Sequence, residues 1–121
     1  MQDRLQVLVV DDDRHMVKTL CDILRHKGYE PIPAYSGEEA VAGVTAKVPD
    51  CVLMDIGMPG LDGVETLTAI RVRAPGVPVV LMSAYVTATR EIEARHQGIE
   101  ALLTKPVNIQ QILGFLDQLK E

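Results

Sequence analysis

Several short apolar runs of this sequence end in charged or hydroxyl residues. Three aspartates, residues 11–13, follow LQVLVV, and Asp55 follows CVLM. Ser83 follows VPVVLM, and Thr104 and Lys105 follow the short run at 101–103. A short apolar run rich in branched residues is typical of a buried strand, so these side chains are expected at strand ends.

These residue types together could hold a cation and receive a phosphate. Neighbouring carboxylates repel one another, and a divalent cation relieves that repulsion. Oxygen ligands suit Mg²⁺, so Asp11 and Asp12 are the expected metal ligands. Lys105 would neutralise an incoming anion, and Ser83 would offer it a hydroxyl donor. Asp55 is the lone carboxylate of the central strand, so we expect phosphoryl transfer onto Asp55.

The elements that must position these residues follow from hydrophobic periodicity. Short apolar runs alternate with stretches that place apolar residues on one helical face. Ser36 with Glu39 forms a capping box, and Asp13 is expected to cap the first helix rather than to bind metal. The expected strands are 5–10, 30–34, 51–54, 77–82 and 101–103, and the expected helices are about 14–27, 36–47, 64–73, 87–97 and 109–119.

Five strands alternating with five helices predict an α/β fold in a single domain over residues 1–121. Such connections are right-handed and build a doubly wound, five-stranded parallel sheet with helices on both faces. The prolines in 30–34 place that strand at an edge. Open parallel sheets bind ligands beyond the carboxyl ends of their strands, where the polar residues above would meet.

Composition excludes several classes of partner. The net charge of −5 and the pI near 5.1 argue against direct binding to nucleic acid or to an anionic membrane. No apolar run is long enough to span a bilayer, and the start has no signal-peptide pattern, so we expect a cytoplasmic protein. Cys21 and Cys51 are expected to be buried free thiols, and the three histidines to be surface residues.

In their order and spacing, four motifs resemble the response-regulator receiver domain of two-component signalling: VLVVDDD (7–13), LMDIGMPGLDG (53–63), VPVVLMSA (77–84) and TKP (104–106). The resemblance covers essentially the whole chain. It implies a flavodoxin-like fold with strand order 2-1-3-4-5. It also implies that the chain is not an enzyme, apart from Mg²⁺-dependent self-phosphorylation and autodephosphorylation.

The resemblance assigns a role to each site residue. Asp55 would take a phosphoryl group from a histidine on a sensor kinase or a phosphotransfer protein. Asp12 and Asp55 would bind Mg²⁺ directly, Asp11 would bind it through water, and Gly57 would bind it through its carbonyl.

Three further positions match the family. Ser83 would hydrogen-bond the phosphoryl group, and Lys105 would pair with it. The Lys105–Pro106 peptide is expected to be cis, and Asp62 to be a turn or cap residue.

One position departs from the family, which usually has an aromatic residue where this chain has Leu102. Phosphorylation would still draw Ser83 and Lys105 inward and switch the face made by the last two helices and the strand between them. A downstream effector would read that face, and the resemblance allows a phosphorylation-dependent homodimer. The helix over 87–97 suits such a switch because its expected apolar anchors are few: Ala88, Ile92 and Ala94. Tyr85 could cover the phosphoryl group or lie in an exposed loop.

Two alternatives stay open. The Asp11-x-Asp13 pattern also fits the start of a haloacid-dehalogenase-type phosphatase, but His15 stands where that family has Thr or Val, and the chain lacks room for its core and cap. A receiver-like interaction module that does not use phosphorylation is the second alternative, supported mainly by Leu102.

Overall fold

The computed structural model describes residues 4–57, 63–84 and 88–119. Every strand and helix expected from the sequence is present, with ends shifted by a few residues at most. The strands are β1 (Gln6–Val10), β2 (Glu30–Ala34), β3 (Cys51–Asp55), β4 (Val79–Ser83) and β5 (Ala101–Thr104). The helices are α1 (Arg14–His26), α2 (Gly37–Ala46), α3 (Gly63–Arg73), α4 (Ala88–His96) and α5 (Ile109–Leu119).

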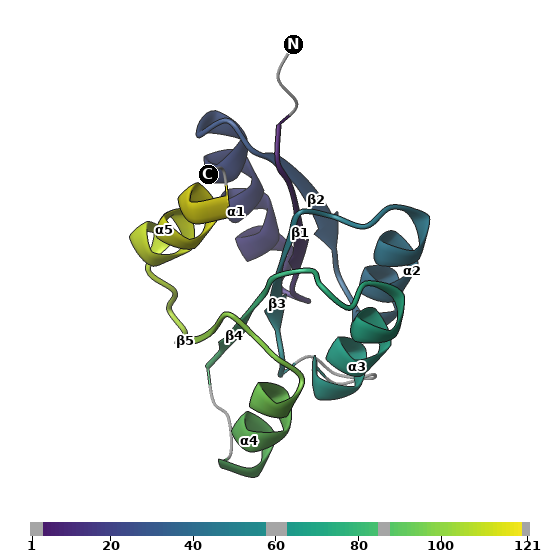
Figure 1. Cartoon of the computed structure of the whole chain (residues 1–121). Helices are drawn as coiled ribbons and strands as arrows, with labels where there is room; N and C mark the ends of the chain where they lie inside the picture. Colours follow the sequence, from purple (N-terminus) through teal and green to yellow (C-terminus); the bar gives the residue numbers. More distant parts are fainter. Residues whose placement is uncertain (1–3, 58–62, 85–87, 120–121) are drawn as a thin grey trace.

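The strands form one parallel sheet in the order β2-β1-β3-β4-β5, which confirms the predicted topology. β1 and β3 lie in the middle of the sheet, and all five residues of β3 and of β4 are buried. The chain runs outward from β1 to β2 and then crosses back to β3, so the order reverses between β1 and β3 (Figure 1). This switch point is where a ligand site is expected.

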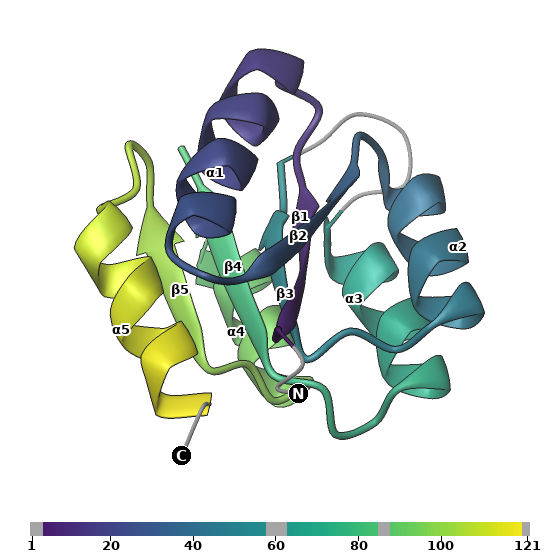
Figure 2. The same cartoon turned by 90° about the horizontal axis from the view of Figure 1, so that it is seen from above.

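Two hydrophobic layers cover the sheet. Helices α1 and α5 pack on one face, and α2, α3 and α4 pack on the other (Figure 2). The first layer includes Leu20 and Leu24 of α1 with Ile112 and Leu116 of α5, all nearly or fully buried. Aliphatic side chains make up most of both layers, in a chain with an aromatic content of only 3%. No helix in the described ranges is long and apolar enough to cross a bilayer.

The edge position of β2 is explained by its prolines. The amide of Glu30 donates to the carbonyl of Leu5 at 2.9 Å, so this amide points toward β1. Successive amides of a strand point to opposite sides. The nitrogens of Pro31 and Pro33 therefore face the free edge of the sheet, where no donor is needed.

Helix caps fix where the site-bearing strands give way to helices. The Asp13 carboxylate accepts hydrogen bonds from the amides of His15 and Met16, both at 3.1 Å, which confirms its capping role. Ser36 Oγ accepts from the Glu39 amide at 3.0 Å, and the Glu39 carboxylate reaches back to the amide of residue 35. Each cap satisfies amides that have no partner within the helix.

The structure corrects the ends of β3, β4 and β5 and the start of β4. Asp55, Ser83 and Thr104 are the last residues of their strands, whereas the sequence placed them just beyond, because pairing continues through them. β4 begins at Val79 and not at Val77, since the Val77 amide bonds back to the turn after α3.

One expected anchor of α4 is wrong. Ile92 was expected to pack against the sheet, but 57% of its surface is exposed. Ala94 is fully buried, and it is the only buried residue among the α4 side chains that the structure describes, residues 91–96. The helical period turns Ile92 away from the face that Ala94 presents to the sheet. Over residues 91–96, α4 therefore has less apolar contact than the sequence suggested.

Both cysteines are buried free thiols, as predicted, with exposed fractions of 5% for Cys21 and 1% for Cys51. Burial raises the pKa of both thiols, and that of Cys51 to about 12. The reactive thiolate is thus suppressed in the folded state. We expect neither thiol to be alkylated by iodoacetamide at pH 8 until denaturant is added, as measured by intact mass. Rapid alkylation of the folded protein would contradict this burial.

Candidate functional site

The carboxyl ends of β1 and β3 place buried carboxylates beside each other. Asp11 follows β1 directly and is fully buried, and Asp55 ends β3 and is 7% exposed. Their backbones are fixed by the sheet, since the Asp11 amide donates to Ala34 at 3.1 Å and the Ile56 amide donates to Met82 at 3.1 Å. The backbone at each carboxylate is therefore held by a flanking strand, β2 beside Asp11 and β4 beside Asp55.

Lys105 brings a positive charge between these two carboxylates. Its Nζ lies 2.6 Å from Asp11 Oδ2 and 3.1 Å from Asp55 Oδ2, and its side chain is 19% exposed. Burial alone would lower the pKa of Lys105, but its hydrogen bonds to Asp11 and Asp55 and their charges outweigh burial and raise it. Lys105 therefore stays protonated throughout the neutral range.

A third carboxylate completes the cluster. Oxygens of Asp11, Asp12 and Asp55 all lie within 4.8 Å of one another. Loss of some of its hydration, followed by the hydrogen bond and the charge of the neighbouring Asp11 carboxylate, raises the pKa of Asp12. One lysine offsets only part of this negative charge. The donor set is purely oxygen, with two buried groups and one exposed, and it fits a hard divalent cation that keeps some of its waters.

The remaining predicted site residues lie around the cluster. The Gly57 amide donates to Asp55 Oδ1 at 2.8 Å, which fixes the orientation of that carboxylate. Ser83 is 3% exposed at the end of β4, and its carbonyl accepts from the Lys105 amide at 2.8 Å. The hydroxyl and the ammonium thus belong to residues joined by a backbone hydrogen bond. The Lys105–Pro106 peptide is cis, as the resemblance implied.

The other candidate residues do not belong to the cluster or lie outside the residues that the structure describes. Asp13 is occupied as a cap, and His15, His26 and His96 are exposed, as predicted. Asp62 and Tyr85 lie outside the described residues. Leu102 is partly buried against the layer of α2, α3 and α4.

Some contacts were not foreseen from the sequence. The Arg14 guanidinium lies 4.0 Å from the ring centroid of Tyr35. The Tyr29 hydroxyl bonds to Asp117 of α5, which links the α1–β2 turn to α5. Both pairs join residues distant in sequence that look like ordinary surface or turn residues, so periodicity and motif spacing give no signal for them.

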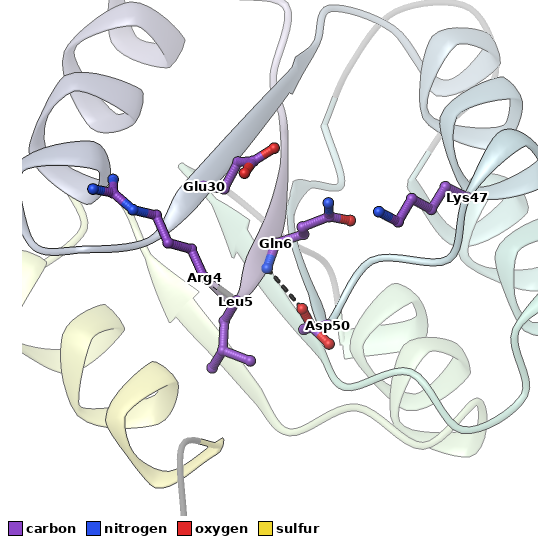
Figure 3. Close-up of a pocket in the computed structure, with 6 residues that line it drawn as sticks. All are labelled: Arg4, Leu5, Gln6, Glu30, Lys47 and Asp50. Carbon is purple, nitrogen blue, oxygen red and sulfur yellow. Dashed lines mark hydrogen bonds between the residues drawn. The ribbon is translucent and has the colours of Figure 1, made fainter. Parts of the chain in front are cut away.

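A polar pocket lies at the other end of the strands, where β1, β2 and β3 begin (Figure 3). It has a volume of about 400 Å³, and Asp50 in its wall accepts a hydrogen bond from the Gln6 amide at 2.7 Å. Two basic and two acidic residues balance in this pocket, and none of the candidate site residues lies there. The pocket is lined by Arg4, Leu5, Gln6, Glu30, Lys47 and Asp50.

Known proteins share this sequence pattern. The family described as the response regulator receiver domain matches residues 7–117. The chain is 35% identical over 118 residues to the transcriptional regulatory protein ZraR of Salmonella typhimurium, covering 98% of this chain and 27% of that protein. It is 38% identical over 111 residues to the response regulator protein FleR of Pseudomonas aeruginosa, covering 92% and 24%. The chain thus spans about a quarter of the length of these relatives.

Solved structures share the fold. A CheY-like receiver domain protein from Methanospirillum hungatei matches with a TM-score of 0.92 at 26% identity, over 98% of this chain and 95% of that one. The chemotaxis protein CheY4 of Vibrio cholerae matches with a TM-score of 0.87 at 26% identity, over 97% and 99%. The family match over nearly the whole chain agrees with the strand order and with the acidic cluster. The chain belongs to the response regulator receiver domain family.

Proposed function

We propose that this chain, as one receiver domain over residues 1–121, accepts a phosphoryl group on Asp55 from a phosphohistidine. The donor is a sensor histidine kinase or a histidine phosphotransfer protein in the cytoplasm. The observation that carries the proposal is the contact of the Lys105 ammonium with Asp11 and Asp55 within a cluster of three carboxylates. A carboxylate nucleophile beside a fixed cation is the arrangement that phosphoryl transfer needs.

Phosphoryl transfer from the donor's histidine to Asp55 needs no third reactant. An oxygen of Asp55 forms a bond to phosphorus while the bond from phosphorus to the donor's imidazole nitrogen breaks, and that nitrogen keeps the electron pair. The other ring nitrogen of the donor carries a proton, so neutral imidazole leaves. Lys105 stabilises the negative charge on the phosphoryl oxygens, and the Ser83 hydroxyl donates to one of them. Asp11, Asp12, Asp55 and the Gly57 carbonyl are the residues that would hold Mg²⁺, which when bound supplies further positive charge to the phosphoryl oxygens.

The switch is proposed to use the face of α4, β5 and α5. A phosphoryl group on Asp55 adds nearly two negative charges, which draw Ser83 and Lys105 toward it. These residues end β4 and follow β5, so a shift of either reaches α4 and β5. An effector domain or protein would read this face, and the same face could support a phosphorylation-dependent homodimer. Leu102 in β5 would act through aliphatic packing in place of an aromatic ring.

Acetyl phosphate with Mg²⁺ provides the direct test of this function. We expect the intact mass to rise by one phosphoryl group, and chelation of Mg²⁺ with EDTA to suppress the addition, because the carboxylate cluster would otherwise repel the anionic donor. Native intact-protein mass spectrometry measures both. If no group is added at any Mg²⁺ concentration, the chain acts as an interaction module that does not use phosphorylation, and Leu102 becomes the central feature of its face.

A further inference from the structure

Arg71 of α3 joins the ends of two helices. Its guanidinium donates to the carbonyls of Gln97, at 3.1 Å, and Gly98, both in the turn that ends α4. It also donates to the carbonyls of Pro75, at 3.3 Å, and Val77, both in the turn after α3. One side chain thus bonds four main-chain oxygens.

These oxygens are well suited to a cation. Carbonyls at the end of a helix have no amide partner within the helix, and the helix dipole makes that end negative. The planar guanidinium presents several donors in fixed directions, so it serves two turns at once. Burial lowers the pKa of Arg71, yet arginine remains protonated at any ordinary pH.

A second contact strengthens the same junction. Gln97 Nε2 donates to Thr68 Oγ1 of α3 at 2.9 Å, one turn before Arg71. Over residues 91–96, the part of α4 whose side chains the structure describes, few apolar contacts hold the helix, because Ala94 is the only buried residue there. α4 begins shortly after Ser83, the last residue of β4, whereas the end of α4 leads into β5.

We propose that Arg71 is the positioning residue of the switch. It fixes the C-terminal end of α4 on α3, so that α4 responds to phosphorylation by pivoting about that end. The inference rests on the proposed function, since it names how the α4 face moves. The moving part is the N-terminal part of α4, and the turn at 97–100 stays in place.

Amide hydrogen exchange on the full chain tests the pivot. In unphosphorylated Arg71→Gln we expect exchange across α4 and the turn at 97–100 to rise about tenfold or more, because several charge-assisted hydrogen bonds are lost. In the wild type treated with acetyl phosphate and Mg²⁺, we expect the exchange rate to change within 88–96 and to stay constant at 97–100. In phosphorylated Arg71→Gln, the change extends through 97–100.

Arg73→Gln is the matched control, because Arg73 lies on the same helix but bonds only to Ala69 of its own helix among the described residues. It should change exchange at 97–100 less than about threefold. Thr68→Val removes the smaller contact and should give an intermediate rise in the same turn. Arg71→Lys keeps the positive charge but not the planar set of guanidinium donors. It tests the inference if the glutamine variant fails to fold.

Two results would overturn the pivot. The first is an exchange rate at 97–100 that rises no more in Arg71→Gln than in Arg73→Gln. An equal rise in the exchange of β1 and β3 would count in the same way, because it would mean a general loss of stability. The second is a phosphorylation response at 97–100 in the wild type as large as that in 88–96. If acetyl phosphate adds no group, the proposed function fails, while the exchange of the unphosphorylated variants still decides whether Arg71 holds α4.

Discussion

Replacing Asp55 by asparagine is expected to abolish phosphoryl uptake from acetyl phosphate completely. The amide has no anionic oxygen to attack phosphorus, and the other two carboxylates of the cluster lie on the β1 side of it. Asparagine is nearly the same size, can still accept the Gly57 amide, and leaves Lys105 paired with Asp11. We therefore expect the free energy of unfolding to change by about 1 kcal/mol or less. Intact mass after incubation and urea denaturation measure the two quantities.

Asp13→Asn is the matched control for this variant. Asp13 lies two residues beyond Asp11, but its carboxylate caps α1, and asparagine caps a helix equally well. This control should take up phosphoryl groups at the wild-type level. Uptake that persists in Asp55→Asn and disappears in a variant of another carboxylate would place the acceptor elsewhere and refute the assignment.

Replacing Lys105 by methionine is expected to lower the free energy of unfolding by about 3 kcal/mol in the presence of EDTA. The ammonium contacts a fully buried and a nearly buried carboxylate, and its removal leaves both without their cation. Mg²⁺ should restore much of this loss, because the cation binds the folded cluster and neutralises the same charges. Urea denaturation with and without Mg²⁺ measures the difference.

Lys18→Met supplies the comparison. Lys18 also pairs with an aspartate, Asp22, at 3.0 Å, but its side chain is 74% exposed. Such surface pairs contribute well under 1 kcal/mol, so we expect a change below about 0.5 kcal/mol and no response to Mg²⁺. Equal losses in the two variants, or a loss in Lys105→Met that Mg²⁺ leaves untouched, would show that Lys105 does not neutralise the cluster.

The fold could be predicted from sequence because its signals are local and repeated. The buried runs of β1, β3 and β4 are short and rich in branched residues, and caps such as Asp13 mark where helices begin. The strand order needed the family resemblance, since alternation of strands and helices alone does not determine which strands are neighbours. The prediction that Ile92 packs against the sheet was wrong because one apolar residue in a short polar helix does not show which face of the helix is buried.

The residues of the site could be predicted from the sequence, but the contacts between their side chains could not. Placing Asp11, Asp55 and Lys105 at one edge follows from the rule that parallel strands end together. That Lys105 bridges both carboxylates depends on side-chain directions that spacing does not determine. Arg71 was missed for the same reason. Its partners are main-chain oxygens, two of them in a turn about 26 residues away, and residue types do not show which main-chain oxygens a side chain reaches.

The orientation of the β2 prolines has a consequence for solubility. An exposed strand edge normally offers amides to any other extended chain, and this is a common route to aggregation. Pro31 and Pro33 remove those donors from the free side of β2 while leaving the pairing with β1 intact. The free side of β2 therefore offers no backbone donor over residues 30–34, so we expect this edge to be a poor template for intermolecular strand pairing.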